Sequence, residues 1–176
     1  MTADGPQVET GYDRAAPDVS VVFSTKNRAD QLKDCLDYVD RLNSPRPWEL
    51  VVVDNGSTDQ TACVLSEYKA RAPFPVRILY EGRAGKARAM NQALRASRGE
   101  IIALIDDDCY VAPDHIDRVL ETFKDPRIGF AGGRVELFDP TDYPLTIRTS
   151  TEPDLLAPRI SHPGRSGMSN SRRADR

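Results

Sequence analysis

Runs of apolar residues alternate with amphipathic segments along most of the chain. Apolar runs that end abruptly at polar residues predict four buried strands, at residues 19–24, 49–54, 76–81 and 100–106. Helical spacing is clearest in the stripe formed by Leu32, Cys35, Leu36, Val39 and Leu42. Such alternation predicts an α/β fold, a Rossmann-like α/β/α sandwich with a mainly parallel central sheet.

The pattern also predicts where the helices begin and where the domain ends. Asn27 and Ser57 are each placed to cap the helix that follows, with Asp30 and Gln60 at the third position of a capping box. We expect a further strand or bent pair at 127–139, with glycines at its kink. The predicted organisation is a flexible leader (1–17), one ligand-binding domain (18–140), and a loop with a basic, disordered tail (141–176).

Composition narrows the classes of protein that fit this pattern. The chain has 176 residues, which suits one domain, and its net charge of −3 argues against a nucleic-acid-binding surface. Three scattered cysteines predict reduced thiols, and no apolar run approaches the about 18 residues of a membrane span. We therefore expect a cytoplasmic protein, or one at the cytoplasmic face of a membrane. Its basic tail leaves weak contact with a membrane surface open, and weak homo-oligomer contact also stays open.

Polar residues gather directly after each predicted strand. The four groups are Ser24–Arg28, Asp54–Asp59, Glu81–Lys86 and Asp106–Asp108. Because the carboxyl ends of parallel strands meet at one edge of a sheet, we expect these groups to share a single ligand-binding rim.

Two of these groups have complementary chemistry. Arg83 and Lys86 precede or begin a helix, whose free N–H groups and positive dipole end suit an anion. Three consecutive carboxylates suit Mn²⁺ or Mg²⁺; in an extended segment Asp106 and Asp108 would point together and Asp107 away. A cation site beside an anion site predicts a diphosphate ligand. Taken alone, an acidic triplet can equally be a solvated turn or a helix cap.

Other nucleotide-binding and catalytic motifs are missing from the sequence. The chain has no GxxxxGK[ST], no GxGxxG after its first strand and no GxSxG. Its two histidines, His115 and His162, are too far apart for a histidine-based metal site.

Three segments together resemble the family 2 glycosyltransferases of the GT-A fold. They are VSVVFSTKNRADQLKDCLDYV, ELVVVDNGSTDQT and GRAGKARAMNQALRASRGEIIALIDDDCYVAPDHI. The resemblance covers about residues 18–139 and implies a nucleotide-diphospho-sugar donor, usually UDP-linked and sometimes GDP- or dTDP-linked. The acceptor, whether glycan, lipid or small molecule, is not implied.

The resemblance also implies roles for individual residues. Asp106 and Asp108 match the DxD motif, with Asp106 toward the ribose or metal and Asp108 as metal ligand, and Asp54 matches the aspartate that binds the base. The expected donor-binding residues are Ser24, Thr25, Asn27, Arg28, Asp54, Gly56, Arg83, Lys86, Arg88, Asp106 and Asp107. The first loop departs from the family's usual P-T-Y-N and lacks its tyrosine.

The implied reaction is metal-dependent transfer of the sugar to an acceptor hydroxyl with inversion. The family's catalytic base is a carboxylate in the acceptor half, beyond the matched segments. We therefore expect either a form truncated before that half or a naturally short form, and leave the base unassigned. Four acids follow the matched part: Asp139, Asp142, Glu152 and Asp154. Two alternatives stay open: a nucleotide-sugar-binding module without transfer activity, and a nucleotidyltransferase.

Overall fold

The computed structural model describes residues 16–135, 138 and 154–156. The chain divides into two compact units, which meet in the sequence between Lys124 and Asp125, and each is described by itself. The predicted domain boundary at residue 140 lies outside the described residues, as does the predicted tail (141–176) except for 154–156.

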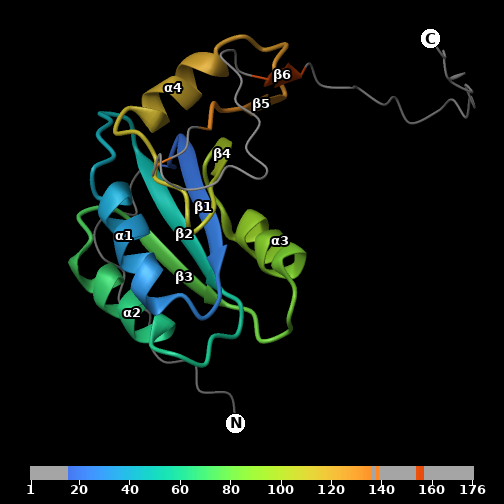
Figure 1. Ribbon diagram of the computed structural model, residues 1–176. Helices are drawn as coiled ribbons and strands as arrows, with labels where there is room; N and C mark the ends of the chain where they lie inside the picture. The colour runs from blue at the N-terminus through green and yellow to red at the C-terminus, as the bar shows by residue number, and fades with distance from the viewer. Residues whose placement is uncertain (1–15, 136–137, 139–153, 157–176) are drawn as a thin grey trace, which may run out of the picture. The chain divides into compact units, whose positions relative to one another are not determined.

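The first unit alternates strands and helices, as predicted (Figure 1). Its elements are β1 (Val19–Thr25), α1 (Ala29–Val39), β2 (Trp48–Asp54), α2 (Thr61–Arg71), β3 (Val76–Tyr80), α3 (Lys86–Ala96), β4 (Ile101–Leu104) and α4 (His115–Thr122). The strands form one parallel sheet in the order β3-β2-β1-β4. The predicted mainly parallel α/β fold is confirmed.

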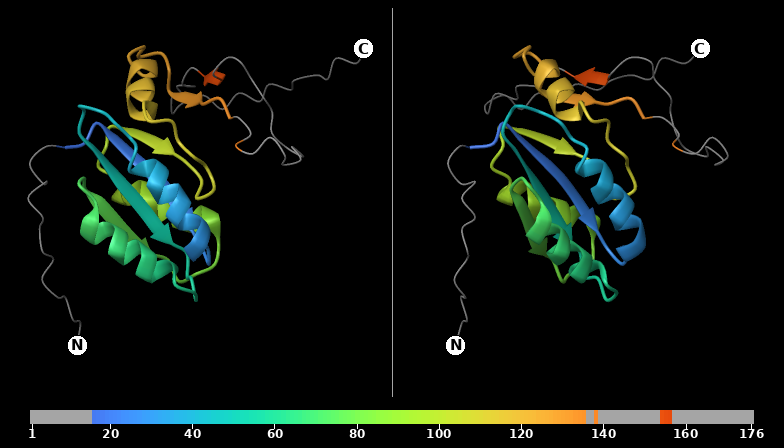
Figure 2. Two further views of the ribbon diagram at one scale, coloured as in Figure 1. Left: turned by 60° about the vertical axis from the view of Figure 1, so that its left-hand side comes forward. Right: turned by 90° about the vertical axis from the view of Figure 1, so that its left-hand side faces the viewer.

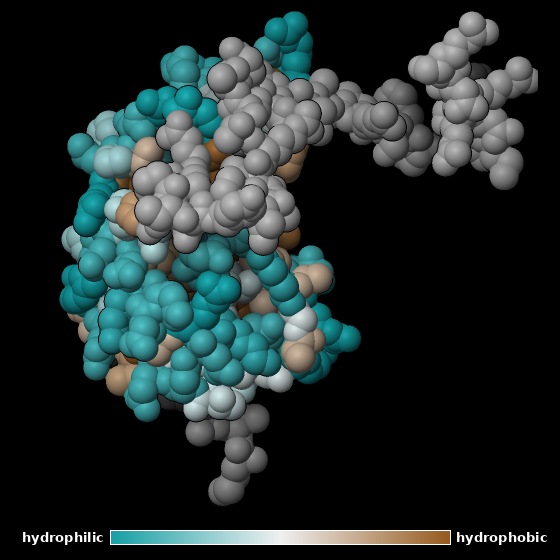
Figure 3. All heavy atoms as spheres, in the orientation of Figure 1, coloured by the Kyte–Doolittle hydropathy of each residue, from teal (hydrophilic) through white to brown (hydrophobic). Residues whose placement is uncertain are grey.

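Helices cover both faces of this sheet (Figure 2). Alternate residues of β1 and β2 point to opposite faces, so Val21 and Leu50 join the core beneath α1 and α2. Val22 and Val51 face α3, which packs through the small side chains Ala89 and Ala93. Burial on both faces explains why these strands read as continuous apolar runs. Over α1 and α2 the described surface is mostly hydrophilic (Figure 3), as the outer face of an amphipathic helix should be.

A buried polar network ties the amino ends of the strands together. Glu49 is only 3% exposed, and its carboxylate accepts hydrogen bonds from the Ser20 hydroxyl at 2.8 Å and the Arg98 backbone N–H at 2.7 Å. Arg77 supplies the balancing charge, 3.2 Å from the other carboxylate oxygen. Gly99 N–H donates to the Ser20 hydroxyl at 2.9 Å. The network therefore joins the α3–β4 connection to β1 and β2.

The second unit contains a short antiparallel pair. β5 (Phe130–Gly132) pairs with β6 (Asp154–Leu156). We expect a strand or bent pair at 127–139, and of the described residues in that range only Phe130–Gly132 form a strand. No helix in the described part of the chain has the length and apolar character that a membrane crossing requires.

Replacing Gly99 with alanine tests how closely the α3–β4 connection packs on β1. An added Cβ would press on the Ser20 backbone nitrogen and lie 2.7 Å from the Val19 carbonyl carbon. Because backbone atoms cannot move aside easily, we expect Gly99→Ala to lower the free energy of unfolding by about 1–3 kcal/mol. Urea unfolding would measure it. Gly133→Ala is the control, since its Cβ would meet nothing within 4 Å; equal effects of the two substitutions would contradict the packing argument.

Candidate functional site

The four polar groups that follow the strands do share one edge of the sheet. β1 lies between β2 and β4, and β2 between β1 and β3, with all strands parallel. We call this the carboxyl-edge site, formed by residues 25–28, 54–59, 81–86 and 106–109. The sequence-based expectation of a shared rim is confirmed.

One end of the carboxyl-edge site is formed by two buried neighbours, Thr25 and Asp54. They are paired in the β1–β2 register, and both are at most 4% exposed. One Asp54 carboxylate oxygen accepts the Ser57 backbone N–H at 2.8 Å. The Thr25 hydroxyl has no hydrogen-bond partner among the described residues. A cavity of about 320 Å³ opens beside Asp54 between α2 and β3.

The loops after β1 and β2 bind each other, and the predicted capping boxes are wrong. Asn27 has a left-handed backbone, with φ of +52°, and its side-chain oxygen accepts the Thr58 N–H at 2.7 Å. The Ser57 hydroxyl accepts the Asn27 backbone N–H at 2.9 Å. Asn27 and Ser57 therefore each accept a backbone hydrogen bond from the other's loop and do not cap a helix. The helices begin later, at Ala29 and Thr61.

Asp59 takes over the capping role at both helix starts. Its two carboxylate oxygens accept the backbone N–H groups of Ala29 at 3.2 Å and Thr61 at 2.9 Å. Hydrogen bonds from Thr61, chiefly from its side chain, and from Ala29 lower the pKa of Asp59. No local sequence signal predicts this role for α1, because Asp59 lies 30 residues beyond Ala29. Gly56, another predicted site residue, supports the same loop with φ of +71°, a conformation that favours glycine.

Asn55 is a second residue that the sequence analysis missed. It is 6% exposed, and its amide group donates to the carbonyl oxygens of Glu81 and Arg83, both at 2.9 Å. Its side-chain oxygen accepts the Gly85 N–H at 3.1 Å. Asn55 thereby fixes the loop that leads from β3 to the start of α3, where Lys86 is the first helical residue.

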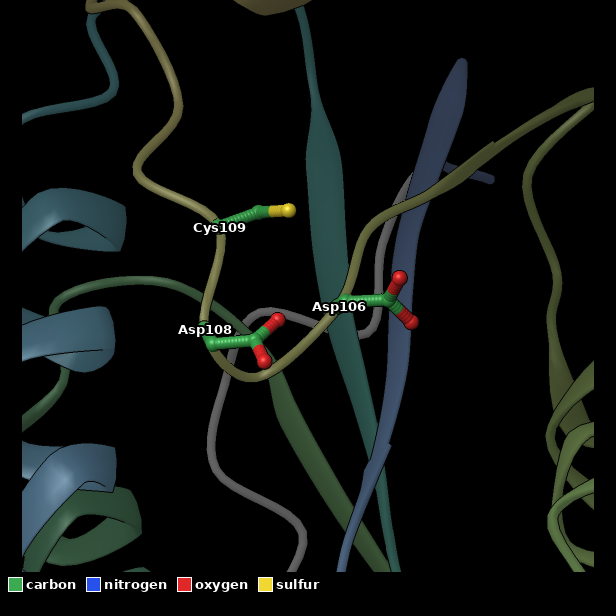
Figure 4. Close-up of side chains that lie close together, drawn as sticks. All are labelled: Asp106, Asp108 and Cys109. Atoms are coloured by element: carbon green, nitrogen blue, oxygen red, sulfur yellow. The ribbon is translucent and has the colours of Figure 1, made fainter. Parts of the chain in front are cut away.

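The acidic triplet forms a turn rather than the extended segment that we expected. β4 ends at Leu104, and the Cys109 N–H donates to the Asp106 carbonyl at 3.1 Å. The side chains of Asp108 and Cys109 nevertheless point across this turn towards Asp106, whose own side chain points away from them (Figure 4). Their carboxylate oxygens and sulfur lie within 4.8 Å of one another. Asp106 and Asp108 thus lie close together, but they do so at a turn and not through the strand alternation that we expected.

Each carboxylate of the triplet has a cation beside it. Lys86 Nζ lies 2.5 Å from Asp106, and this hydrogen bond raises the pKa of the Lys86 ammonium. The Arg28 guanidinium reaches both other acids, with Nη1 3.2 Å from Asp108 and Nε 3.7 Å from Asp107. The mutual repulsion of three adjacent carboxylates is therefore compensated within the protein.

Two further predicted anion-binding residues occupy different positions. Arg83 forms a bidentate pair with Glu81, both contacts at 2.9 Å, and its guanidinium is engaged within its own loop. The hydrogen bonds from Arg83 lower the pKa of Glu81 to about 2. Arg88 is exposed in the first turn of α3, and Ser24 is half-buried at the end of β1. Asp139, Asp142 and Glu152 lie outside the described residues, and Asp154 belongs to β6.

The donor set of the triplet fits a hard divalent cation. Mn²⁺ and Mg²⁺ bind one or two carboxylates and complete their shells with water and phosphate oxygens, and Asp106 and Asp108 supply two carboxylates that lie close together. The start of α3 supplies free N–H groups for an anion on the same edge.

Comparison with known proteins identifies the family. The profile described as Glycosyl transferase family 2 matches residues 20–172, most of the chain. The chain belongs to this family, and its parallel sheet with flanking helices is the GT-A fold.

Individual relatives agree with this assignment. An uncharacterized glycosyltransferase, alr2836, from Nostoc sp. is 26% identical over 78% of the chain, and AglE from Haloferax volcanii is 29% identical over 70%. The mannosyltransferase PcManGT from Pyrobaculum calidifontis, solved with GDP-Man and Mn²⁺, matches 76% of the chain at 31% identity with a TM-score of 0.63. The chain spans about two fifths of the length of each of these three proteins.

Replacing Asn55 tests whether it holds the β3–α3 loop. Asn55→Ala removes three hydrogen bonds from a buried position, so we expect the free energy of unfolding to fall by about 1–3 kcal/mol in urea titrations. Asn91→Ala, at an exposed position of α3, is the matched control and should change stability little. An equally small effect of Asn55→Ala would show that the β3–α3 loop keeps its conformation without the Asn55 hydrogen bonds.

The Glu81–Arg83 pair makes stability depend on acid pH. The folded-state pKa of Glu81 is about 2 and its ordinary value is 4.5, so the stabilisation is fully present above pH 4.5. It is lost as the pH falls from 4.5 through about 2. We expect Glu81→Gln to melt below the wild type at pH 6, with the difference in melting temperature shrinking across that window. A constant difference would contradict the assignment.

Proposed function

We propose that this chain binds a nucleotide-diphospho-sugar, UDP-linked in the first instance, at the carboxyl-edge site and transfers the sugar to an acceptor hydroxyl with metal dependence and inversion. The observation that carries the proposal is the contact between Lys86, at the start of α3, and Asp106, in the acidic turn. This contact brings an anion-binding helix start and a cation-binding turn together, as a diphosphate with its metal requires.

The proposal divides the donor among named groups. Asp54 would accept a hydrogen bond from the base, and the unpaired Thr25 hydroxyl beside it would take up a donor or acceptor of the nucleoside. Lys86, Arg88 and the N–H groups of α3 would bind the diphosphate. Asp106 and Asp108 would hold the metal, which when bound stabilises negative charge on the leaving diphosphate.

The solved relatives support this choice of ligand. PcManGT was solved with GDP-Man and Mn²⁺, and TarS from S. aureus, 28% identical with a TM-score of 0.50, was solved with UDP-GlcNAc. Since the two carry different bases and sugars, they favour a nucleotide sugar as the class of donor and leave the base of this chain's donor to experiment.

In the proposed reaction, the acceptor oxygen forms a bond to the anomeric carbon as the bond from that carbon to the diphosphate oxygen breaks. The diphosphate leaves with the electron pair, where Lys86 and the N–H groups of α3 stabilise it. The hydroxyl proton passes to a carboxylate base. Attack from the face opposite the leaving group inverts the anomeric centre. The base is left unassigned.

A second function is donor binding without transfer. One observation favours it: the described carboxylates at the edge are engaged in loop contacts or ion pairs or are proposed for base and metal binding. They are Asp54, Asp59, Glu81 and Asp106–Asp108. Turnover of a nucleotide sugar onto any acceptor hydroxyl would exclude this second function.

Replacing Asp108 tests the proposed donor site. Asp108→Asn removes the charge of a proposed metal ligand, so UDP affinity measured by calorimetry in the presence of Mn²⁺ should fall about tenfold or more. Affinity without Mn²⁺ should change little. Asp114→Asn is a matched control, because Asp114 is exposed and pairs with Arg118 at the start of α4.

Unchanged UDP affinity of Asp108→Asn in Mn²⁺ would contradict the proposal. In the wild type, a thermal-shift panel of UDP-GlcNAc and GDP-Man, each with and without Mn²⁺, would show which nucleotide sugar binds, because a ligand that binds only the folded state raises the melting temperature with its saturation.

A further inference from the structure

We infer that Arg28 couples metal binding to donor binding: it is a counter-ion for the acidic turn when no metal is present, and the donor's diphosphate draws it away. The inference rests on the proposed function and adds that metal binding and donor binding at that site strengthen each other. Metal alone should bind weakly, and metal with a nucleoside diphosphate should bind strongly.

The geometry of Arg28 carries the first step. Its guanidinium reaches the acidic turn from the loop after β1, across 80 residues of sequence, and divides between two carboxylates. Nη1 lies 3.2 Å from the Asp108 carboxylate, the proposed metal ligand, and Nε lies 3.7 Å from Asp107. A cation bound to Asp108 would compete with the guanidinium, because two positive charges on one carboxylate repel each other and share its charge.

The Arg28 backbone is fixed while its side chain can move. Its N–H donates to the hydroxyl of the fully buried Thr61 at 3.1 Å, and its carbonyl accepts the Leu32 N–H at 2.8 Å. The side chain is 41% exposed, and Asp108 is 59% exposed. Breaking this ion pair therefore requires rotation of a partly solvated side chain and no movement of the loop.

Charge balance gives the direction of the effect. The three carboxylates of the turn face two cations, Arg28 and Lys86, so little negative charge remains to attract a divalent ion. A diphosphate at the start of α3 supplies negative charge for both cations. Each ligand thereby improves the site for the other, and this coupling must be reciprocal in the binding free energies.

The test measures Mn²⁺ and UDP binding separately in the full chain. In Arg28→Gln, affinity for Mn²⁺ alone, followed by the electron paramagnetic resonance signal of free Mn²⁺, should rise about three- to tenfold, as expected for loss of two partly exposed ion pairs. UDP affinity in saturating Mn²⁺ should fall by a similar factor, because the diphosphate loses a cation. Arg28→Lys keeps the positive charge but lacks the planar guanidinium, so each of its affinities should lie between that of the wild type and that of Arg28→Gln.

Arg46→Gln is the matched control. It removes the same positive charge from a different ion pair, the one that Arg46 makes at 2.5 Å with Asp18, the residue before β1. Neither the affinity for Mn²⁺ nor the affinity for UDP should change more than about twofold. The gain in Mn²⁺ affinity of Arg28→Gln should also shrink as ionic strength rises. Urea unfolding of Arg28→Gln would establish that the variant is folded.

The outcomes separate this inference from the proposed function. If the wild type binds UDP with Mn²⁺ through Asp108, but Arg28→Gln binds Mn²⁺ alone no better than Arg46→Gln does, the coupling role is wrong and the proposed function stands. If the wild type binds neither Mn²⁺ nor UDP, the proposed function falls and this inference falls with it.

Discussion

The register of β1 between two parallel neighbours is the constraint on which the site depends. Every side chain of β1 except the half-buried Ser24 is buried, and opposite faces of the strand pack under different helices, so a slip of one residue would exchange the two apolar sets. At the amino end, Ser20 and its register partner Glu49 are joined by a hydrogen bond that fixes the same alignment. With the register fixed at one end, the loops at the other end must emerge side by side.

Much of this arrangement could be predicted from the sequence. Buried parallel strands are continuous apolar runs, and β1 and β2 were located to within one residue at each end. The shared rim followed from parallel topology alone. β4 proved shorter than its apolar run, because the chain leaves the sheet after Leu104 to form the acidic turn. Hydrophobic pattern does not record where a strand's last hydrogen bond falls.

The contacts that organise the site could not be predicted in the same way. Asn27 and Ser57 carry the local signature of helix caps, yet each is hydrogen-bonded to the loop of the other, 30 residues away. Asn55 and Asp59 likewise act on chain segments 26 to 30 residues distant. Capping rules consider four consecutive residues, and tertiary partners compete for the same hydrogen-bonding groups. Once the loops meet at a common edge, these partners decide which cap forms.

Two kinds of compensated charge in this chain differ in a way that bears on function. Glu49 is buried at 3% exposure with hydrogen bonds to both carboxylate oxygens, so its partners cannot leave without a large desolvation penalty. Asp106 and Asp108 are 51% and 59% exposed and are each held by a solvated cation. Water can replace either partner at little loss of free energy. A buried carboxylate with fixed partners, such as Glu49, suits a permanent structural role. Exposed ion pairs, such as those of Asp106 and Asp108, suit a site whose cations would change partners when a ligand binds. The exposure of the acidic turn is therefore as informative as its charge.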